Sequence, residues 1–289
     1  NAMFQLLKAM RPHQWIKNLF VLAALVFSKH LFDPSYALRS GAAFALFCLL
    51  SGAVYLLNDI LDLENDRLHP EKRHRPIASG KLRARTAAVA ALLISLAVFF
   101  AAFLLNDRFG WVLLAYGGLN LGYSFRLKHV VILDVMIVSS GFLLRAIGGA
   151  FAIGVEISSW FILCTMLLAL FLGFGKRRQE LILLENATDH RRILEDYTPQ
   201  FLDQTIAVVT AGALVTYALY TMSPEVVEKL GTERLNFTIP FVVYGLLRYL
   251  FLVYNKGQGG NPSSTVLSDP SLLVAGALWV LTLAAVLYL

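Results

Sequence analysis

The sequence predicts an all-α, polytopic membrane protein with nine transmembrane helices. Of its 289 residues, 57% are hydrophobic and only 15% are charged, and the mean hydropathy is +0.64. Soluble domains carry roughly 25% charged residues, so lipid must solvate part of this surface. The apolar residues fall into runs of about 20, the length that a helix needs to cross a bilayer. Strand alternation is absent, and helices satisfy their own backbone hydrogen bonds in lipid.

The apolar runs follow one another along the whole chain. In order, they lie at residues 15–32, 37–61, 84–105, 109–125, 130–153, 159–175, 203–222, 237–254 and 271–289. Because no separate soluble segment interrupts them, we expect residues 1–289 to form a single transmembrane domain. Asn1 and Ala2, before Met3, are expected to be a tag remnant. We do not expect a cleaved signal peptide, since the first run contains Lys17 and leads into further spans.

Basic residues concentrate in every second loop. They precede the first run and follow the second, fourth and sixth runs, whereas the alternate loops contain fewer. The positive-inside rule therefore places the N-terminus and these basic loops in the cytoplasm, and the C-terminus outside. The net charge of +6 thus indicates orientation and anionic ligands rather than nucleic acid.

The second run ends in three acids spaced i, i+3, i+7, namely Asp59, Asp62 and Asp66, flanked by Asn58. On a helix they would lie within a fan of roughly 60°. Carboxylates this close repel one another, so a cation should offset them. Oxygen ligands completed by substrate phosphates favour Mg²⁺. A solvated acidic helix end, or a cation or proton pathway, would give the same spacing.

A basic loop follows these acids directly. It contains Lys72, Arg73 and Arg75 between prolines at positions 70 and 76. Such side chains can neutralise phosphate oxygens, and arginine can do so with two parallel hydrogen bonds. Ordinary positive-inside charge is the alternative interpretation. Acids for a metal beside bases for phosphates are nevertheless the two halves of a Mg²⁺–diphosphate site.

Two charged residues, Asp134 and Arg145, lie inside the fifth apolar run. They share a helix stripe but stand about 16 Å apart, so they cannot pair and each needs another partner. Intramembrane charges are functional by default, although an interhelical structural pair is a fair rival. Further polar candidates at the cytoplasmic ends of runs, which could also be simple anchors, are Lys17, Asn18, Tyr123, Lys128, Lys176 and Arg177.

Two motifs together resemble a known group. The pattern Asn58-Asp59-x-x-Asp62-x-x-x-Asp66, followed by Arg-Pro-Ile-Ala-x-Gly at 75–80, is similar to the first motif of the UbiA-type intramembrane prenyltransferase superfamily. The resemblance implies nine helices around a central cavity, in agreement with the number of runs. It also implies a bacterial cytoplasmic membrane protein whose active-site loops face the cytoplasm.

The resemblance is stronger to the decaprenyl-phosphate phosphoribosyltransferase branch of that superfamily. It covers roughly residues 11–180 and rests on Gln-Trp-Ile-Lys-Asn at 14–18, Asp-Arg-x-His-Pro-x-Lys-Arg-x-Arg-Pro at 66–76, Tyr-Ser-x-x-Leu-Lys at 123–128, residues 139–147 and Gly-Lys-Arg at 175–177. Ordinary prenyltransferases usually carry a second Asp-x-x-x-Asp motif. Here the residue four positions after Asp134 is Val138. This departure favours the phosphoribosyl branch.

The resemblance implies Mg²⁺-dependent transfer of 5-phosphoribose from 5-phosphoribosyl 1-diphosphate to a polyprenyl monophosphate in the bilayer, with release of diphosphate. The implied metal ligands are Asp59, Asp62 and Asp66, and Asp134 joins them as a catalytic candidate. The implied substrate-binding residues are Lys17, Asn18, Asn58, Lys72, Arg73, Arg75, Tyr123, Lys128, Arg145, Lys176 and Arg177. Prenyl transfer from a polyprenyl diphosphate and a cation-coupled transporter remain alternatives. The oligomeric state stays open.

Overall fold

A computed structural model of the chain describes residues 2–184, 196–257 and 262–288. Within these ranges every regular element is a helix, so the prediction of an all-α fold is confirmed. The predicted runs agree closely with several helices. Residues 84–105 form α5 (Ala84–Leu105), and the run at 37–61 forms α3 (Pro34–Leu61). The run at 159–175 belongs to a longer helix, α8 (Ser159–Leu184), which continues through the basic residues at its end.

The expected number of nine membrane spans is not confirmed. In the described ranges, seven helical segments are long and apolar enough to cross a bilayer. They are α3, α5, α7 (Leu133–Ile153), α8, α9 (Pro199–Met222), α11 (Ile239–Asn255) with the preceding η5 (Arg234–Thr238), and α13 (Pro270–Tyr288). The first run instead forms the 3-10 helix η1 (Pro12–Leu22) and the short α2 (Ala23–Phe27). The fourth forms α6 (Asp107–Phe125), whose glycines and polar residues dilute its apolar character.

Short helices precede or connect these segments. They are α1 (Ala2–Ala9), α4 (Leu63–Leu68), η2 (Lys72–His74), η3 (Leu127–His129), α10 (Pro224–Leu230) and α12 (Pro262–Ser268). Side-chain caps fix several helix starts, because the first N–H groups of a helix lack intrahelical partners. The Asp33 carboxylate accepts from Ser35 N at 2.9 Å, and the Thr198 hydroxyl accepts from Phe201 N at 3.1 Å. Local sequence therefore sets where α3 and α9 begin.

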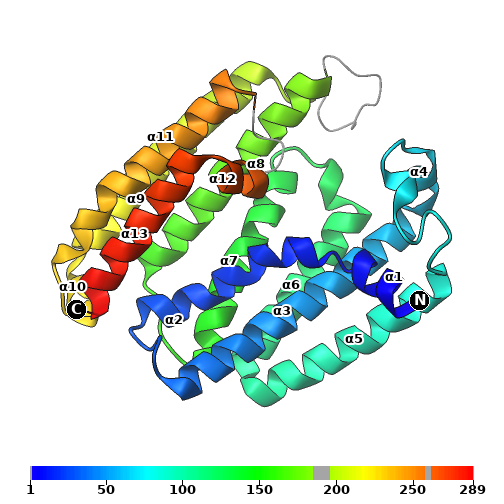
Figure 1. The fold of residues 1–289 in the computed structure, drawn as a ribbon, viewed down its shortest axis with the longest axis horizontal. Helices are drawn as coiled ribbons and strands as arrows, with labels where there is room; N and C mark the ends of the chain where they lie inside the picture. Colours follow the sequence, from blue (N-terminus) through cyan, green and yellow to red (C-terminus); the bar gives the residue numbers. More distant parts are fainter. Residues whose placement is uncertain (1, 185–195, 258–261, 289) are drawn as a thin grey trace. The chain divides into compact units, whose positions relative to one another are not determined.

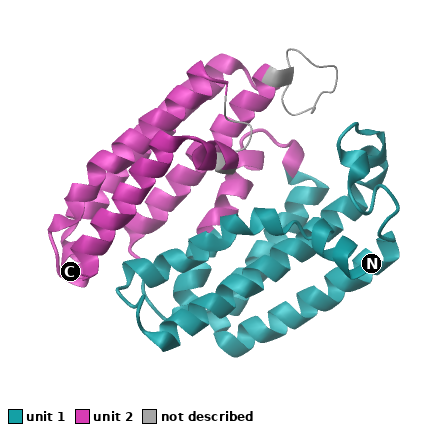
Figure 2. Cartoon of the chain, in the orientation of Figure 1, with its two compact units in different colours: residues 1–127, 144–156 teal, residues 128–143, 157–289 magenta. Residues whose placement is uncertain are grey.

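The chain divides into two compact units (Figure 2). Unit 1 contains residues 1–127 and 144–156, and unit 2 contains residues 128–143 and 157–289. Helix α7 therefore gives its first half to unit 2 and its second half to unit 1. The expectation of a single transmembrane domain stays a prediction.

In unit 1, helix α3 packs against η1, α5 and α6 (Figure 1). The ring of Phe47 lies edge-on to Phe109 and Tyr116 in its core. The second half of α7 approaches η1 so closely that a Cβ on Gly149 would overlap the Val21 carbonyl oxygen. A glycine at this position therefore lets polar side chains of η1 and α7 meet.

In unit 2, α8 packs along α9, and α11 packs against α9 and α13 (Figure 1). The core includes Phe171, Leu202, Ile206 and Tyr249. Outside these cores, large apolar side chains remain exposed, and α5 alone exposes Val89, Leu92, Leu93, Leu96, Phe100 and Leu104. Such a continuous apolar face suits lipid rather than water. The chain is an integral membrane protein.

Candidate active site

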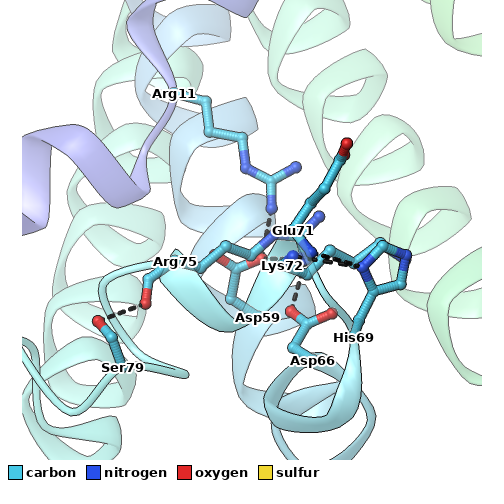
Figure 3. Close-up of polar contacts among 8 residues, drawn as sticks. All are labelled: Arg11, Asp59, Asp66, His69, Glu71, Lys72, Arg75 and Ser79. Carbon is cyan, nitrogen blue, oxygen red and sulfur yellow. Dashed lines mark hydrogen bonds and ion pairs between the residues drawn. The ribbon is translucent and has the colours of Figure 1, made fainter.

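Four charged side chains of unit 1 form what we call the acid–arginine cluster: Arg11, Asp59, Asp66 and Arg75 (Figure 3). Asp59 lies in the last turn of α3, and Asp66 lies in α4. Arg75 follows η2, while Arg11 lies in the turn between α1 and η1. The cluster thus joins segments that are 48 residues apart in the chain.

One guanidinium group bridges the two acids of the cluster. Nη1 of Arg75 donates to Asp66 Oδ2 at 2.5 Å and to Asp59 Oδ1 at 3.1 Å. Arg11 Nη2 also donates to Asp59 Oδ1. Both acids are only 2% exposed. The cations that the sequence led us to expect beside these carboxylates are, in part, the protein's own arginines.

The second carboxylate oxygen of Asp59 has no hydrogen-bond partner, although it is buried. A buried charged oxygen without a donor is costly, because it has lost its water and gained nothing in return. Such an atom suits a ligand that brings positive charge. One or two carboxylates completed by substrate phosphates is the usual way in which proteins hold Mg²⁺. The donor chemistry of the cluster therefore fits that ion.

Asp62 departs from the expected geometry. Helix α3 ends at Leu61 and α4 begins at Leu63, so the half-buried Asp62 lies at a break between two helices. The three acids therefore do not share one continuous helix. In the parts of the chain that the structure describes, no group of three acidic, histidine or cysteine side chains is placed to hold a metal. The three-carboxylate metal set stays a prediction.

The basic loop is folded onto itself through His69. Its Nδ1 accepts from the backbone N–H groups of Glu71 at 3.2 Å and Lys72 at 3.3 Å (Figure 3). The Ser79 hydroxyl donates to the Arg75 carbonyl oxygen at 2.8 Å. These contacts fix the backbone on both sides of Arg75. The side chains of Lys72 and Arg73 are exposed, and they take no part in the acid–arginine cluster.

A second buried polar group of unit 1 surrounds Arg145. Its Nε donates to Asn18 Oδ1 at 2.6 Å, and its Nη2 donates to the Tyr116 hydroxyl at 2.8 Å. The Asn18 amide in turn donates to Cys48 Sγ at 3.2 Å and Ser51 Oγ at 3.3 Å. The expectation that Arg145 needs a partner other than Asp134 is confirmed.

Three more candidates belong to unit 1. Asn58, next to Asp59 on α3, accepts a hydrogen bond from the Ser124 hydroxyl at the end of α6. Lys17 in η1 and Tyr123 in α6 are half-buried. The structure therefore brings the first-motif asparagine to the end of α6, where Ser124 follows the predicted candidate Tyr123.

In unit 2, Asp134, Arg177 and Tyr197 form what we call the Asp134 cluster. The Asp134 side chain is fully buried and both of its oxygens have donors. Arg177 Nε donates to Oδ2 at 2.6 Å, and the Tyr197 hydroxyl donates to Oδ1 at 2.8 Å. The same hydroxyl accepts from Ile132 N at 2.7 Å. Burial raises the pKa of Tyr197, so its hydroxyl keeps its proton and can donate.

Arg177 also pairs with Glu180, and the other bases of unit 2 near it lie nearer to water. The exposed Lys176 lies 3.7 Å from a Glu180 carboxylate oxygen. Lys128 is half-buried in η3. Arg178 pairs with Asp203 at 2.5 Å and lies over the ring of Tyr254. The basic end of α8 is therefore an ion-pair network rather than a row of free anchors.

Sequence reasoning missed three members of these groups. Arg11 was counted only as positive-inside charge, His69 was given no role, and Tyr197 lies outside every apolar run. A motif signal existed for His69, because the loop motif that supported the resemblance includes it. No spacing pattern could have paired Arg11 with Asp59, since only tertiary packing brings them together.

Comparison with known proteins adds independent findings. The model of the UbiA prenyltransferase family matches residues 18–177. The decaprenyl-phosphate phosphoribosyltransferase of Corynebacterium glutamicum is 37% identical over 98% of this chain and 87% of its own length. The enzymes of the same name from Mycolicibacterium smegmatis and Mycobacterium tuberculosis are 37% and 33% identical, covering 94% and 95% of their own lengths.

Solved structures agree at the level of the fold. A UbiA homolog from Archaeoglobus fulgidus bound to GPP and Mg²⁺ superposes with a TM-score of 0.72 at 16% identity, over 99% of this chain and all of that one. The structure of a digeranylgeranylglyceryl phosphate synthase gives a TM-score of 0.67 at 14% identity, over 99% of this chain and 96% of that one. These likenesses establish a shared helical architecture.

Proposed function

The chain belongs to the UbiA prenyltransferase family, a family of transferases, and on that premise we propose that it is a phosphoribosyltransferase. Its donor would be 5-phosphoribosyl 1-diphosphate and its acceptor a polyprenyl monophosphate, with Mg²⁺ as cofactor. The names of the relatives, which align over nearly the whole chain, support this choice of substrates. The observation on which the proposal depends is the acid–arginine cluster.

The cluster offers both kinds of group that a diphosphate donor requires. Asp59, Asp66 and the nearby Asp62 would hold Mg²⁺, and the unpartnered Oδ2 of Asp59 is the first atom available to it. When bound, the ion supplies positive charge to the donor diphosphate. Arg11 and Arg75 lie against the same carboxylates, so their remaining N–H groups would be available to phosphate oxygens. Lys72 and Arg73, which are exposed on the same loop, would add positive charge on the solvent side.

The reaction breaks the bond between ribose C1 and the diphosphate oxygen and forms a bond from C1 to an oxygen of the acceptor phosphate. C1 gains oxocarbenium character as diphosphate leaves. The arginines would stabilise the negative charge that develops on the leaving group. Electrostatic stabilisation of this kind is usually the largest single contribution to catalysis. Because the acceptor is already an anion, no strong general base is required.

Other candidates would bind the second phosphate of the donor or that of the acceptor. They are Lys17, Asn18, Asn58, Tyr123, Lys128, Arg145, Lys176 and Arg177. We propose that Asp134 orients Arg177 rather than abstracting a proton, since both of its oxygens accept hydrogen bonds. The polyprenyl tail would lie against apolar helix faces open to lipid. The excess of bases in these loops supports a cytoplasmic site in a bacterial inner membrane.

Prenyl transfer from a polyprenyl diphosphate is a second candidate. It is favoured by the solved UbiA homologs of the same fold that were bound to GPP or DMAPP with Mg²⁺. It is disfavoured by the residue four positions after Asp134, which is Val138 rather than an acid. The two candidates share the first motif and differ in the donor that they consume.

The proposed site is tested with two variants, Asp59→Asn and Asp62→Asn, purified in detergent. We expect Asp59→Asn to lower transfer from labelled phosphoribosyl diphosphate by about 100-fold or more, since it removes charge next to the reacting groups. Glu64→Gln is the matched control, because Glu64 is exposed on α4 and pairs with the exposed Arg67. Full activity in folded Asp59→Asn and Asp62→Asn proteins would overturn the assignment.

A further inference from the structure

The acid–arginine cluster neutralises itself. We propose that Arg11 is a built-in counter-cation of Asp59 that exchanges partners as the site is loaded, so that metal and diphosphate bind with strong positive coupling. This inference rests on the proposed function insofar as the ligand is a metal–diphosphate complex. It concerns how the site admits that complex, and it assigns Arg11 a role that the sequence did not suggest.

The charges of the cluster balance. Asp59 and Asp66 contribute two negative charges, and Arg11 and Arg75 contribute two positive charges within hydrogen-bond distance. A divalent cation arriving alone would meet two guanidinium groups beside its ligands. A diphosphate arriving alone would meet two buried carboxylates. Each ligand by itself is therefore repelled by half of the cluster.

A metal–diphosphate complex meets no such barrier. Its cation can take the carboxylate oxygens, and the arginines that lose those oxygens can take the phosphate oxygens. Arginine suits this exchange, because its planar guanidinium binds carboxylates and phosphates in the same geometry. Every ion pair that is broken is replaced by another. Each ligand thus removes the obstacle to the other.

The burial of the partners indicates which of them can move. Asp59, in the last turn of α3, is 2% exposed, whereas the Arg11 side chain is 24% exposed. Arg11 also lies over the Tyr55 ring, with 4.9 Å from its guanidinium carbon to the ring centroid. That contact does not depend on the carboxylate. The arginine can therefore turn away from Asp59 while the Tyr55 ring still supports its guanidinium.

One further observation points to a ligand at this place. The Oδ2 atom of Asp59 is buried and has no donor, so the arginines leave one metal-ligand position open.

The test measures binding to the full-length protein in detergent without any phosphoribosyl donor. The probes are Mn²⁺ alone and the preformed Mn²⁺–diphosphate complex, detected by electron paramagnetic resonance. In Arg11→Gln we expect Mn²⁺ alone to bind about 10-fold tighter than in the wild type, because its competitor is gone. We expect the Mn²⁺–diphosphate complex to bind about 10-fold weaker, because a phosphate partner is gone. Exchange of partners by Arg11 predicts these opposite changes in the two affinities.

Two further variants complete the design. Arg67 lies on α4 beside Asp66 but pairs with the exposed Glu64. Arg67→Gln should therefore change neither the affinity for Mn²⁺ nor the affinity for Mn²⁺–diphosphate. Arg11→Lys guards against misfolding of the glutamine variant, and should shift both affinities in the same directions by smaller factors. Unchanged or weakened Mn²⁺ binding in both Arg11 variants would overturn the inference.

The inference and the proposed function can fail separately. If the wild type shows the coupling but turns over only prenyl diphosphates, the phosphoribosyl assignment fails and the exchange stands. If phosphoribosyl transfer is observed but Mn²⁺ binding does not respond to Arg11 substitution, the exchange fails and the assignment stands.

Discussion

The acid–arginine cluster of unit 1 and the Asp134 cluster of unit 2 both pair buried aspartates with arginines. They differ in how many of the carboxylate oxygens have hydrogen-bond donors. Asp59 shares one oxygen between two arginines and leaves the other without a donor. Asp134 has one donor for each oxygen, and its side chain is fully buried. The arginines that hold Asp59 and Asp66 are about one-quarter exposed, whereas Arg177 is 6% exposed.

This difference separates a site that can exchange partners from one that holds its geometry. Buried ion pairs with complete hydrogen bonding fix the positions of the elements that carry them, and they are expensive to break. Charged groups near solvent that lack some of their hydrogen-bond partners are available to a ligand. We therefore expect changes in unit 1 to alter binding and activity first, and changes in unit 2 to alter stability first.

The largest expected effect is on stability, in Asp134→Asn. The substitution leaves the buried Arg177 guanidinium without its carboxylate at Nε, which should cost about 3 kcal/mol of unfolding free energy. Titration of the detergent-solubilised protein with SDS measures this change. The control is Asp203→Asn, at an acid 40% exposed that pairs with Arg178, where the loss should be about 1 kcal/mol or less. Equal losses would erase the contrast between buried and exposed pairs.

Arg75→Gln should show the opposite profile. It removes the bridge between Asp59 and Asp66 and a candidate phosphate ligand, so transferase activity should fall about 100-fold. The two carboxylates then repel each other, and added Mg²⁺ should recover the thermal stability that is lost. Arg67→Gln, on the neighbouring α4 with an exposed side chain that pairs with Glu64, is the matched control. A stability loss that Mg²⁺ does not recover would place Arg75 with the purely structural arginines.

Tyr197→Phe tests the Asp134 cluster by removing a single oxygen atom. It removes the hydroxyl that donates to Asp134 and accepts from Ile132 N, which should cost about 2 kcal/mol of unfolding free energy. Tyr249→Phe is the comparison within the same core, because the Tyr249 hydroxyl is buried without a partner. Its removal should be nearly neutral. If both variants behave alike in the SDS titration, the Tyr197 hydrogen bonds contribute nothing specific.

The smallest effect is expected for His69→Ala. The loop loses the acceptor for the Glu71 and Lys72 N–H groups, which water can partly replace, so stability should change by about 0.5–1 kcal/mol. The looser backbone next to Arg75 should appear as faster amide hydrogen exchange in residues 69–75. Asn at this position can supply a similar acceptor. Identical exchange in wild type and His69→Ala would show that the histidine does not order the loop.

The sequence predicted the long helices well, because lipid exposure demands continuous apolar runs. Residues 84–105 agree with α5 to the residue. The number of spans was less well predicted, since an apolar run does not guarantee a regular α-helix. The run at 15–32 begins as the 3-10 helix η1, which passes tightly against Gly149 of α7. That close approach is a tertiary feature without a local signal.

The candidate site was predicted in its acids and only partly in its partners. Asp59 and Arg75 were found from motif spacing, and the structure pairs them. Asp134 and Arg145 were correctly judged unable to pair with each other, but their partners Arg177, Asn18 and Tyr116 could not be assigned from spacing. Arg11 and Tyr197 were missed, because each acts through a contact with a residue at least 48 positions away.

The most direct test of the central claim offers the purified protein both candidate donors under identical conditions. Labelled phosphoribosyl diphosphate is supplied with a polyprenyl phosphate, and a labelled prenyl diphosphate is supplied with an aromatic acceptor, each with Mg²⁺. We predict a lipid-soluble labelled product from the first pair only, lost with EDTA and in Asp59→Asn. A preparation that turns over the prenyl diphosphate and leaves phosphoribosyl diphosphate untouched would contradict the account and make the chain an ordinary prenyltransferase.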